Sequence, residues 1–160
     1  MDEDGVAELE ILVQALAANI EAYAQAALQL RRYRDYALCR RQELERRRLN
    51  DLLAEELPVI PPPVPFRSAM WLRLHRIATS FRLRRHADKM LLRDLRREDM
   101  MLLKLIAAFM EANRLSRNCH RHLRTLVETV IRADNEIAQL VRRKPSPAFA
   151  FVPSPTGAGL

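Results

Sequence analysis

Glycine is nearly absent from this sequence. The three glycines are Gly5, Gly157 and Gly159, and none lies between Val6 and Thr156. Phosphate-binding loops and dinucleotide-binding turns need glycine because the backbone must approach the ligand closely. Tight β-hairpin turns need it because they require positive φ angles. The shortage therefore excludes the glycine-rich nucleotide motifs and argues against a β-sheet protein.

Cysteine is also scarce, and no long uninterrupted apolar run is present. The two cysteines, Cys39 and Cys119, make no disulfide framework. The acidic N-terminus, with Asp2 and Asp4, is the reverse of a signal peptide. The most apolar window, 11–30, still contains five Asn, Gln or Glu residues, which a lipid-exposed span tolerates poorly. We therefore expect an intracellular protein of the cytoplasm, its cytoskeleton or the nucleus, neither secreted nor transmembrane.

Acidic residues are outnumbered by basic ones. The chain has 27 Lys and Arg against 20 Asp and Glu, and its net charge is +7. Nearly all the basic residues are arginine. This balance indicates an acidic partner, such as nucleic acid, anionic lipid or an acidic protein face. The alternative is an arginine-biased but merely solvated helix surface.

A long heptad pattern dominates what is present. From Leu74 to Leu140, positions spaced alternately by three and four residues are apolar, apart from Arg84, Asp88, Glu98 and Ser116. Such a seam packs one long helix along another. The stretch 66–144 contains neither glycine nor proline, so the sequence predicts one heptad helix over this range.

The rest of the chain divides around a proline cluster. Residues 1–57 have their own apolar seam and predict a first helix from about Val6 to Leu57. Residues 58–65 contain five prolines, which end that helix and form a stiff connector. Residues 145–160 have no helical pattern and predict a disordered tail.

These elements predict an all-α protein, a long antiparallel helical hairpin or coiled coil. In the hairpin the acidic N-terminus lies beside Arg114, which matches opposite charges. The alternative is a three-helix bundle, which requires the second helix to break near 113–118. We favour a continuous helix because the heptad pattern passes through that stretch without a skip.

The hairpin leaves the end of the longer helix without an intramolecular partner. An exposed apolar seam of that length predicts an assembly surface for other helical subunits, in a homo- or hetero-oligomer. The sequence therefore favours a non-enzymatic structural subunit or adaptor of a cytoskeletal, spindle, kinetochore or trafficking assembly. The predicted interface residues are Leu123, Leu126, Val130, Ala133, Ile137 and Leu140.

Two other functions use the arginines. A basic helical protein could bind nucleic acid through the surface at the proline end, because arginine matches phosphate geometry. The stretch 66–85 also has the apolar spacing and charge of a helix that binds calmodulin or an anionic membrane surface, or it forms hairpin core. A membrane partner is the less favoured of these. The predicted basic patch is Arg40, Arg41, Arg47, Arg48, Arg82, Arg84 and Arg85.

The remaining motifs are short. An SH3-ligand pattern is formed by Pro62, Pro65 and Arg67, and Ser146 and Ser154 precede prolines as phosphorylation candidates. Cys119, His120 and His122 resemble metal ligands, but only two of them share a helix face, which is too few. We predict no metal site, no cofactor and no catalytic constellation.

Overall fold

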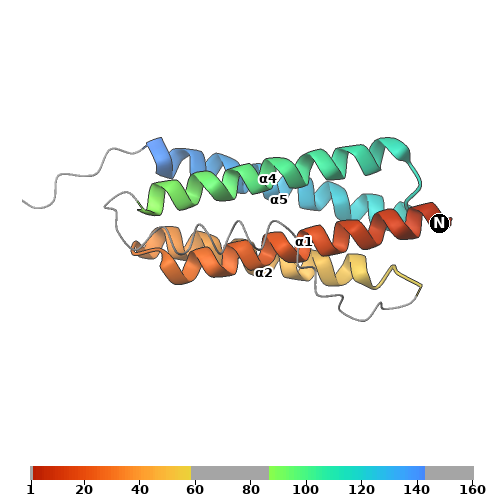
Figure 1. The fold of residues 1–160 in the computed structure, drawn as a ribbon, viewed down its shortest axis with the longest axis horizontal. Helices are drawn as coiled ribbons and strands as arrows, with labels where there is room; N and C mark the ends of the chain where they lie inside the picture. The colour runs from red at the N-terminus through yellow and green to blue at the C-terminus, as the bar shows by residue number, and fades with distance from the viewer. Residues whose placement is uncertain (1, 59–86, 143–160) are drawn as a thin grey trace, which may run out of the picture.

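The described part of the chain is entirely helical. The structure is a computed structural model, and it describes residues 2–58 and 87–142. Within these residues it contains no strand. The four helices shown in Figure 1 are α1 (Glu3–Gln29), α2 (Tyr33–Ala54), α4 (Ala87–Ala112) and α5 (Arg117–Arg142). The all-α prediction is confirmed, but the predicted two-helix hairpin is wrong, because the helices pack as a four-helix bundle.

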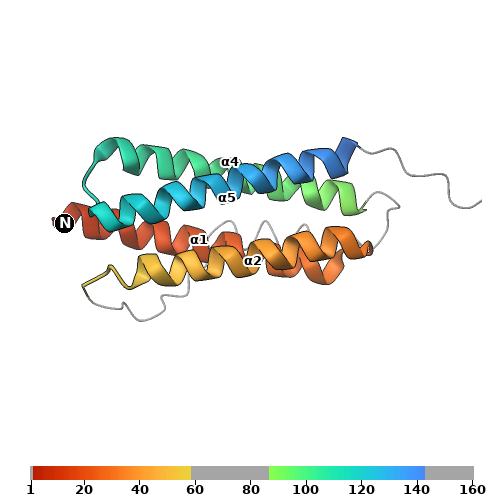
Figure 2. The ribbon, with the colours of Figure 1, turned by 180° about the vertical axis from the view of Figure 1, so that it is seen from behind.

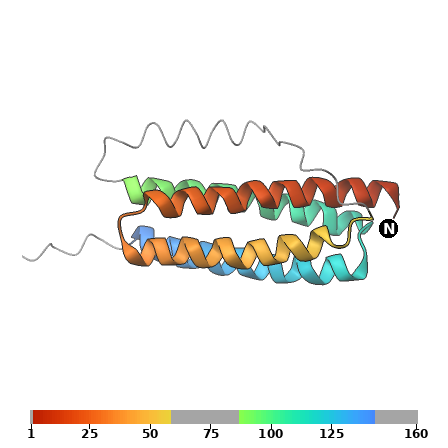
Figure 3. The same cartoon turned by 90° about the horizontal axis from the view of Figure 1, so that it is seen from below.

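Neighbouring helices of the bundle are antiparallel. Helices α1 and α2 form one hairpin, and α4 and α5 form the other (Figure 2). The hairpins pack side by side, so that α1 lies along α4 and α2 along α5 (Figure 3). The pairing of α1 with α4 brings Arg114 to 3.1 Å from Asp4 and 3.4 Å from Glu8. This confirms the predicted contact between the acidic N-terminus and Arg114.

Helices α2 and α4 are diagonal neighbours that run in the same direction. Consequently the C-terminal end of α2 and the N-terminal end of α4 lie at opposite ends of the bundle (Figure 1). Four-helix bundles with one long connection are a known alternative to bundles in which every connection is short.

The first helix breaks where the sequence predicts continuity. The side chain of Asp2 caps α1 by accepting a hydrogen bond of 2.8 Å from the Gly5 amide. The helix ends at Gln29, and Leu30 and Arg32 both adopt extended backbone angles. The predicted single helix from Val6 to Leu57 is therefore wrong. A turn of extended residues needs no positive φ angle, so the lack of glycine did not prevent it.

The second break falls near 113–118, the stretch that must break in the alternative three-helix prediction. Helix α4 ends at Ala112, and Asn113 adopts a left-handed conformation with φ 53°. Asparagine is one of the few residues that tolerate this conformation in place of glycine. Ser116 then caps α5 by accepting a hydrogen bond of 3.1 Å from the Cys119 amide. The continuous helix over 66–144 is thus wrong, and the break near 113–118 is correct.

Two apolar clusters fill the bundle. One lies at the end holding the α1 N-terminus and is built around Leu9, Leu53 and Ile106. The other lies at the opposite end, around Ala26, Leu92 and Ile137. The heptad seams of α1 and α5 both supply this core, so the predicted apolar faces are real, although their partners belong to the same chain.

The composition of helix α1 also fits a membrane-spanning helix. Among the described helices it alone is long and apolar enough to cross a membrane by length and composition. The core helix of a bundle passes the same test, because it also carries apolar residues over most of its length. In this structure α1 packs against α2 and α4. The prediction of no membrane span stays a prediction.

Candidate interaction site

A layer of polar side chains crosses the bundle between the two apolar clusters. We call it the polar layer. Helix α1 contributes Asn19 and Tyr23, α2 contributes Arg46, and α4 contributes Asp99. All four are buried, with exposed fractions of 2% or less. An ion pair between Arg46 and Asp99 at this depth is unusual, because charged residues are almost never fully buried unless they are paired.

The polar layer is closely hydrogen-bonded. The Arg46 guanidinium donates from Nη1 to Asp99 Oδ1 at 2.5 Å and from Nη2 to Asp99 Oδ2 at 2.9 Å. Tyr23 donates its hydroxyl to Asp99 Oδ2 at 2.7 Å, and Asn19 donates its amide to Oδ1 at 3.1 Å. Arg46 also donates to the Asn19 carbonyl oxygen. The two-point contact between a guanidinium and a carboxylate is directional, so it fixes α2 and α4 relative to each other.

The pKa values in the polar layer favour the charged arginine and the neutral tyrosine. Burial alone would lower the pKa of Arg46, but its hydrogen bonds to Asp99 and the nearby Tyr23 raise it above its usual value. Burial raises the pKa of Tyr23 well above its usual value, and Asp99 adds to this while Arg46 opposes it. The Arg46 guanidinium carbon also lies 4.2 Å from the centre of the Tyr23 ring, within cation–π range.

Gln42 borders the polar layer but does not join it. It lies one turn before Arg46 on the same face of α2 and is fully buried. Neither its amide nitrogen nor its amide oxygen has a hydrogen-bond partner among the described residues. A buried polar group without a partner costs about 1–3 kcal/mol.

Replacing Gln42 is therefore expected to stabilise the protein. Gln42→Met keeps the side-chain length and removes the amide, so it should raise the free energy of unfolding by about 1–3 kcal/mol. Urea unfolding followed by circular dichroism measures this change. The matched control Gln29→Met, at an exposed position of α1, should change stability by less than about 0.5 kcal/mol. A loss of stability in Gln42→Met would contradict the assignment of this amide as unpartnered.

Cys39 is a buried thiol whose pKa is affected by the charges of Arg46 and Asp99 in the polar layer. Burial raises the pKa of the Cys39 thiol to about 12, and Asp35 adds to the rise while Arg46 opposes it. A thiol with this pKa stays protonated at neutral pH and is a poor nucleophile. The polar layer and Cys39 are thus buried away from solvent in the interior of the bundle.

The predicted interface residues all lie in this closed interior. Leu123, Leu126, Val130, Ala133 and Ile137 are 0% exposed, and Leu140 is 8% exposed. They face α1, α2 and α4 of the same chain through the two apolar clusters. The prediction of an unpartnered seam is therefore wrong, because the helical break near 113–118 folds α5 back into the bundle.

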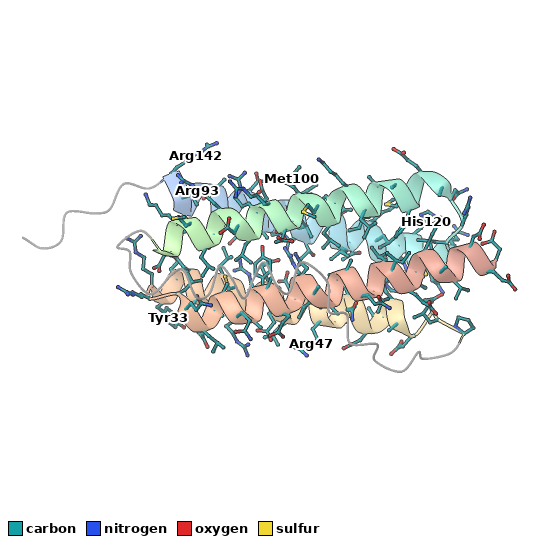
Figure 4. All side chains as sticks on the ribbon, in the orientation of Figure 1. Tyr33, Arg47, Arg93, Met100, His120 and Arg142 are labelled. Atoms are coloured by element: carbon teal, nitrogen blue, oxygen red, sulfur yellow. The ribbon has the colours of Figure 1, made fainter. Side chains whose placement is uncertain are left out.

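The predicted basic patch is only partly within the description. Arg40 and Arg47 both pair with Glu43, and Arg41 pairs with Glu136 at 2.6 Å. Arg48 is exposed on α2. Figure 4 shows Arg47 on the outer side of α2. Arg82, Arg84 and Arg85 lie outside the described residues.

The positive charge of the chain is concentrated in those undescribed stretches. Residues 59–86 and 143–160 together contain eight Lys and Arg and no acidic residue, whereas the net charge of the whole chain is +7. The described bundle is therefore not basic overall.

Several other predicted sites also lie outside the described residues. These are the SH3-ligand residues Pro62, Pro65 and Arg67, the phosphorylation candidates Ser146 and Ser154, the basic amphipathic stretch 66–85 and the tail 145–160. Within 2–58 and 87–142, no cluster of three or more His, Cys, Asp or Glu side chains could hold a metal ion.

One solvent-open depression combines polar and apolar side chains. It has a volume of about 350 Å3 and lies between α2 and α5, and we call it the α2–α5 groove. Leu38 and Leu140, 5% and 8% exposed, form its apolar floor. The residues that line it are Tyr33, Arg34, Ala37, Leu38, Arg41, Glu136, Gln139 and Leu140.

Exposed apolar side chains lie beside this groove on the outer face of α2. Tyr33 is 82% exposed, Leu44 is 57% exposed and Tyr36 is 39% exposed. The rings of Tyr33 and Tyr36 are tilted against each other, with centres 6.3 Å apart. Tyrosine and arginine are enriched at protein–protein interfaces. These residues lie outside the apolar seam, so the heptad spacing does not predict them as an interface.

The fold and these sites define the protein as a four-helix bundle with a buried ion pair and a tyrosine-flanked surface groove. Comparisons of the chain with protein-family models, with curated proteins and with solved structures found no match in any of the three.

Proposed function

We propose that this protein is a non-enzymatic structural subunit or adaptor, which binds another protein through the outer face of α2 and the α2–α5 groove. This keeps the class of function that the sequence favours but assigns the partner to a different surface. The seam on α5 is buried within the chain, so it has no free apolar face to offer. The outer face of α2 has exposed apolar side chains. It also carries tyrosine and arginine, which are frequent among the residues that dominate binding energy at interfaces.

The observation that carries this proposal is the exposed tyrosine pair beside the groove. Tyr33 has 82% of its surface in contact with solvent and lies next to the depression floored by Leu38 and Leu140. An exposed aromatic ring gains free energy when a partner covers it, at about 25 cal/mol per Å2 of apolar surface. Its few rotatable bonds keep the entropy loss on binding small.

A rigid bundle suits this role. The Arg46–Asp99 pair ties α2 to α4 across the core, and Arg41 ties α2 to Glu136 of α5 at the groove. A surface that is already ordered loses less entropy on binding than a flexible one. The polar layer therefore supports the function indirectly, by holding α2 in place.

Site-specific photo-crosslinking in cells that express the chain tests this proposal. A photoreactive amino acid at position 33 or 44, on the outer face of α2, should give discrete heavier adducts that contain a second protein. The matched control is position 131, because Ile131 on α5 is an aliphatic residue of similar exposure to Leu44, 48% against 57%. It should give few adducts.

Two results would count against the proposal. Adducts of equal yield at 33, 44 and 131 would mean nonspecific encounters, and an absence of adducts at 33 and 44 would mean that this surface has no partner. Circular dichroism of each variant checks that the substitutions leave the bundle folded, which we expect because all three positions are exposed.

A further inference from the structure

The α2–α5 groove has enough volume to receive one apolar side chain of a partner. Its volume of about 350 Å3 falls at the lower end of the range of ligand pockets. Its lining includes the buried side chains of Leu38 and Leu140 and the small side chain of Ala37. An aliphatic or aromatic side chain of a partner could pack against these leucines and lose its contact with water.

The rim of the groove is positive. Arg34 is exposed and forms no ion pair within 4 Å with any residue of the described chain. Arg41 forms its ion pair with Glu136 while half of its side chain stays exposed. Arg31 and Arg32 precede α2 and are also exposed. Figure 4 shows Arg142 at the same end of the bundle as Tyr33.

This combination favours an acidic helix over other partners. The groove runs between two antiparallel helices, and such grooves accept the side-chain ridge of a third helix. A nucleic acid would leave the leucine floor without an apolar partner. An amphipathic helix places carboxylates three or four residues from an apolar side chain, on the same face.

We infer, building on the proposed function, that the α2–α5 groove binds an acidic amphipathic helix of a partner protein. One apolar side chain of that helix packs on Leu38 and Leu140. Its neighbouring carboxylates pair with Arg34 and compete with Glu136 for Arg41. Tyr33 covers the exposed side of the helix.

The experiment uses two designed helical peptides as probes. They share the same leucine pattern, and one carries Glu and the other Lys at the positions that flank it. Fluorescence anisotropy of the labelled peptides, titrated with the full chain, measures both affinities. The Glu peptide should bind at least about tenfold more tightly than the Lys peptide, and its affinity should fall as salt is added.

A charge reversal at Arg34 locates the site. Arg34→Glu should weaken binding of the Glu peptide at least about tenfold and should strengthen binding of the Lys peptide. The matched control is Arg124→Glu, which makes the same change of net charge on α5 at an exposed position that does not line the groove. It should change either affinity by less than about twofold.

Three results would overturn the inference. One is equal affinity for both peptides, and another is an equal loss of binding in Arg34→Glu and Arg124→Glu, which would mean unspecific attraction. The third is binding of a single-stranded RNA oligonucleotide that Arg34→Glu abolishes while neither peptide binds. Crosslinks at position 33 without any preference for the Glu peptide would overturn this inference but leave the proposed function in place.

Discussion

Asp99→Ala is expected to lower the free energy of unfolding by about 3–5 kcal/mol, the cost of breaking a buried ion pair from one side. The substitution leaves the Arg46 guanidinium with no counter-charge at 0% exposure. It also removes the acceptor for the Tyr23 hydroxyl and the Asn19 amide, which both donate to this carboxylate. Urea unfolding followed by circular dichroism measures the loss.

The matched control for this prediction is Asp94→Ala on the same helix. Asp94 pairs with Arg97 at 3.3 Å, but the Arg97 side chain is 80% exposed. Exposed ion pairs contribute about 0–1 kcal/mol, so the control should lose no more than that. Equal losses in the two variants would contradict a buried, structurally essential pair.

A double variant separates the charge from the packing. In Arg46→Met with Asp99→Leu no charge remains in the polar layer, and replacing a whole buried pair by apolar residues is often neutral or stabilising. We expect it to be more stable than Asp99→Ala. A double variant less stable than Asp99→Ala would show that the hydrogen bonds of Asn19 and Tyr23 outweigh the cost of the buried charge.

Leu126→Ala is expected to lower the free energy of unfolding by about 2–5 kcal/mol, because it leaves a cavity in the core. Leu126 is 0% exposed and packs in the cluster around Leu9, Leu53 and Ile106. Urea unfolding measures this loss, and light scattering on the same samples measures the mass in solution. The mass should be unchanged, because the side chain faces the interior of its own chain.

The control for Leu126→Ala is Ile131→Ala on the same helix, which is 48% exposed and should lose less than about 1 kcal/mol. The experiment also distinguishes a core from an interface. If Leu126→Ala kept full stability but changed an oligomer into a monomer, the α5 seam would be an assembly surface after all, as the heptad pattern alone suggests.

The helical faces could be predicted from the sequence, but their partners could not. Every seam position of α5 from Cys119 to Leu140 is buried, as the heptad spacing indicates. The spacing fixes only which side chains share a face of the helix. It carries no information on whether the apolar face packs against the same chain or another one, and so the α5 seam was assigned to an oligomer.

The two breaks between helices differ in how clearly the sequence signals them. Asn113 and Ser116 are residues that favour a left-handed turn and a helix cap, so the break near 113–118 could be named in advance. The break at 30–32 has no such signal, because Leu30 and Arg32 turn through extended conformations that any residue adopts. A chain that is continuous at both breaks forms a two-helix hairpin, and the two breaks together make it a four-helix bundle.

The proposed interaction surface could not be predicted from the sequence either. Arg34 and Tyr33 are ordinary residues in a sequence that has many arginines and three tyrosines. They become a candidate site only because α5 brings Glu136 and Leu140 alongside α2. The separation along the chain between these helices is too long for any local pattern to reveal the contact.

The sequence was sufficient to predict that the protein is helical and which faces of its helices are apolar. The break near 113–118 was predicted only as an alternative to a continuous helix. These properties depend on residues that are close together along the chain. The sequence could not show that Arg46 and Asp99 are core residues. Burying a charge is costly unless it is paired and hydrogen-bonded, and here the partners of each charge lie on other helices, which only the tertiary structure brings together. The tertiary structure also decided that the α5 seam is internal, because burial depends on what the rest of the chain covers.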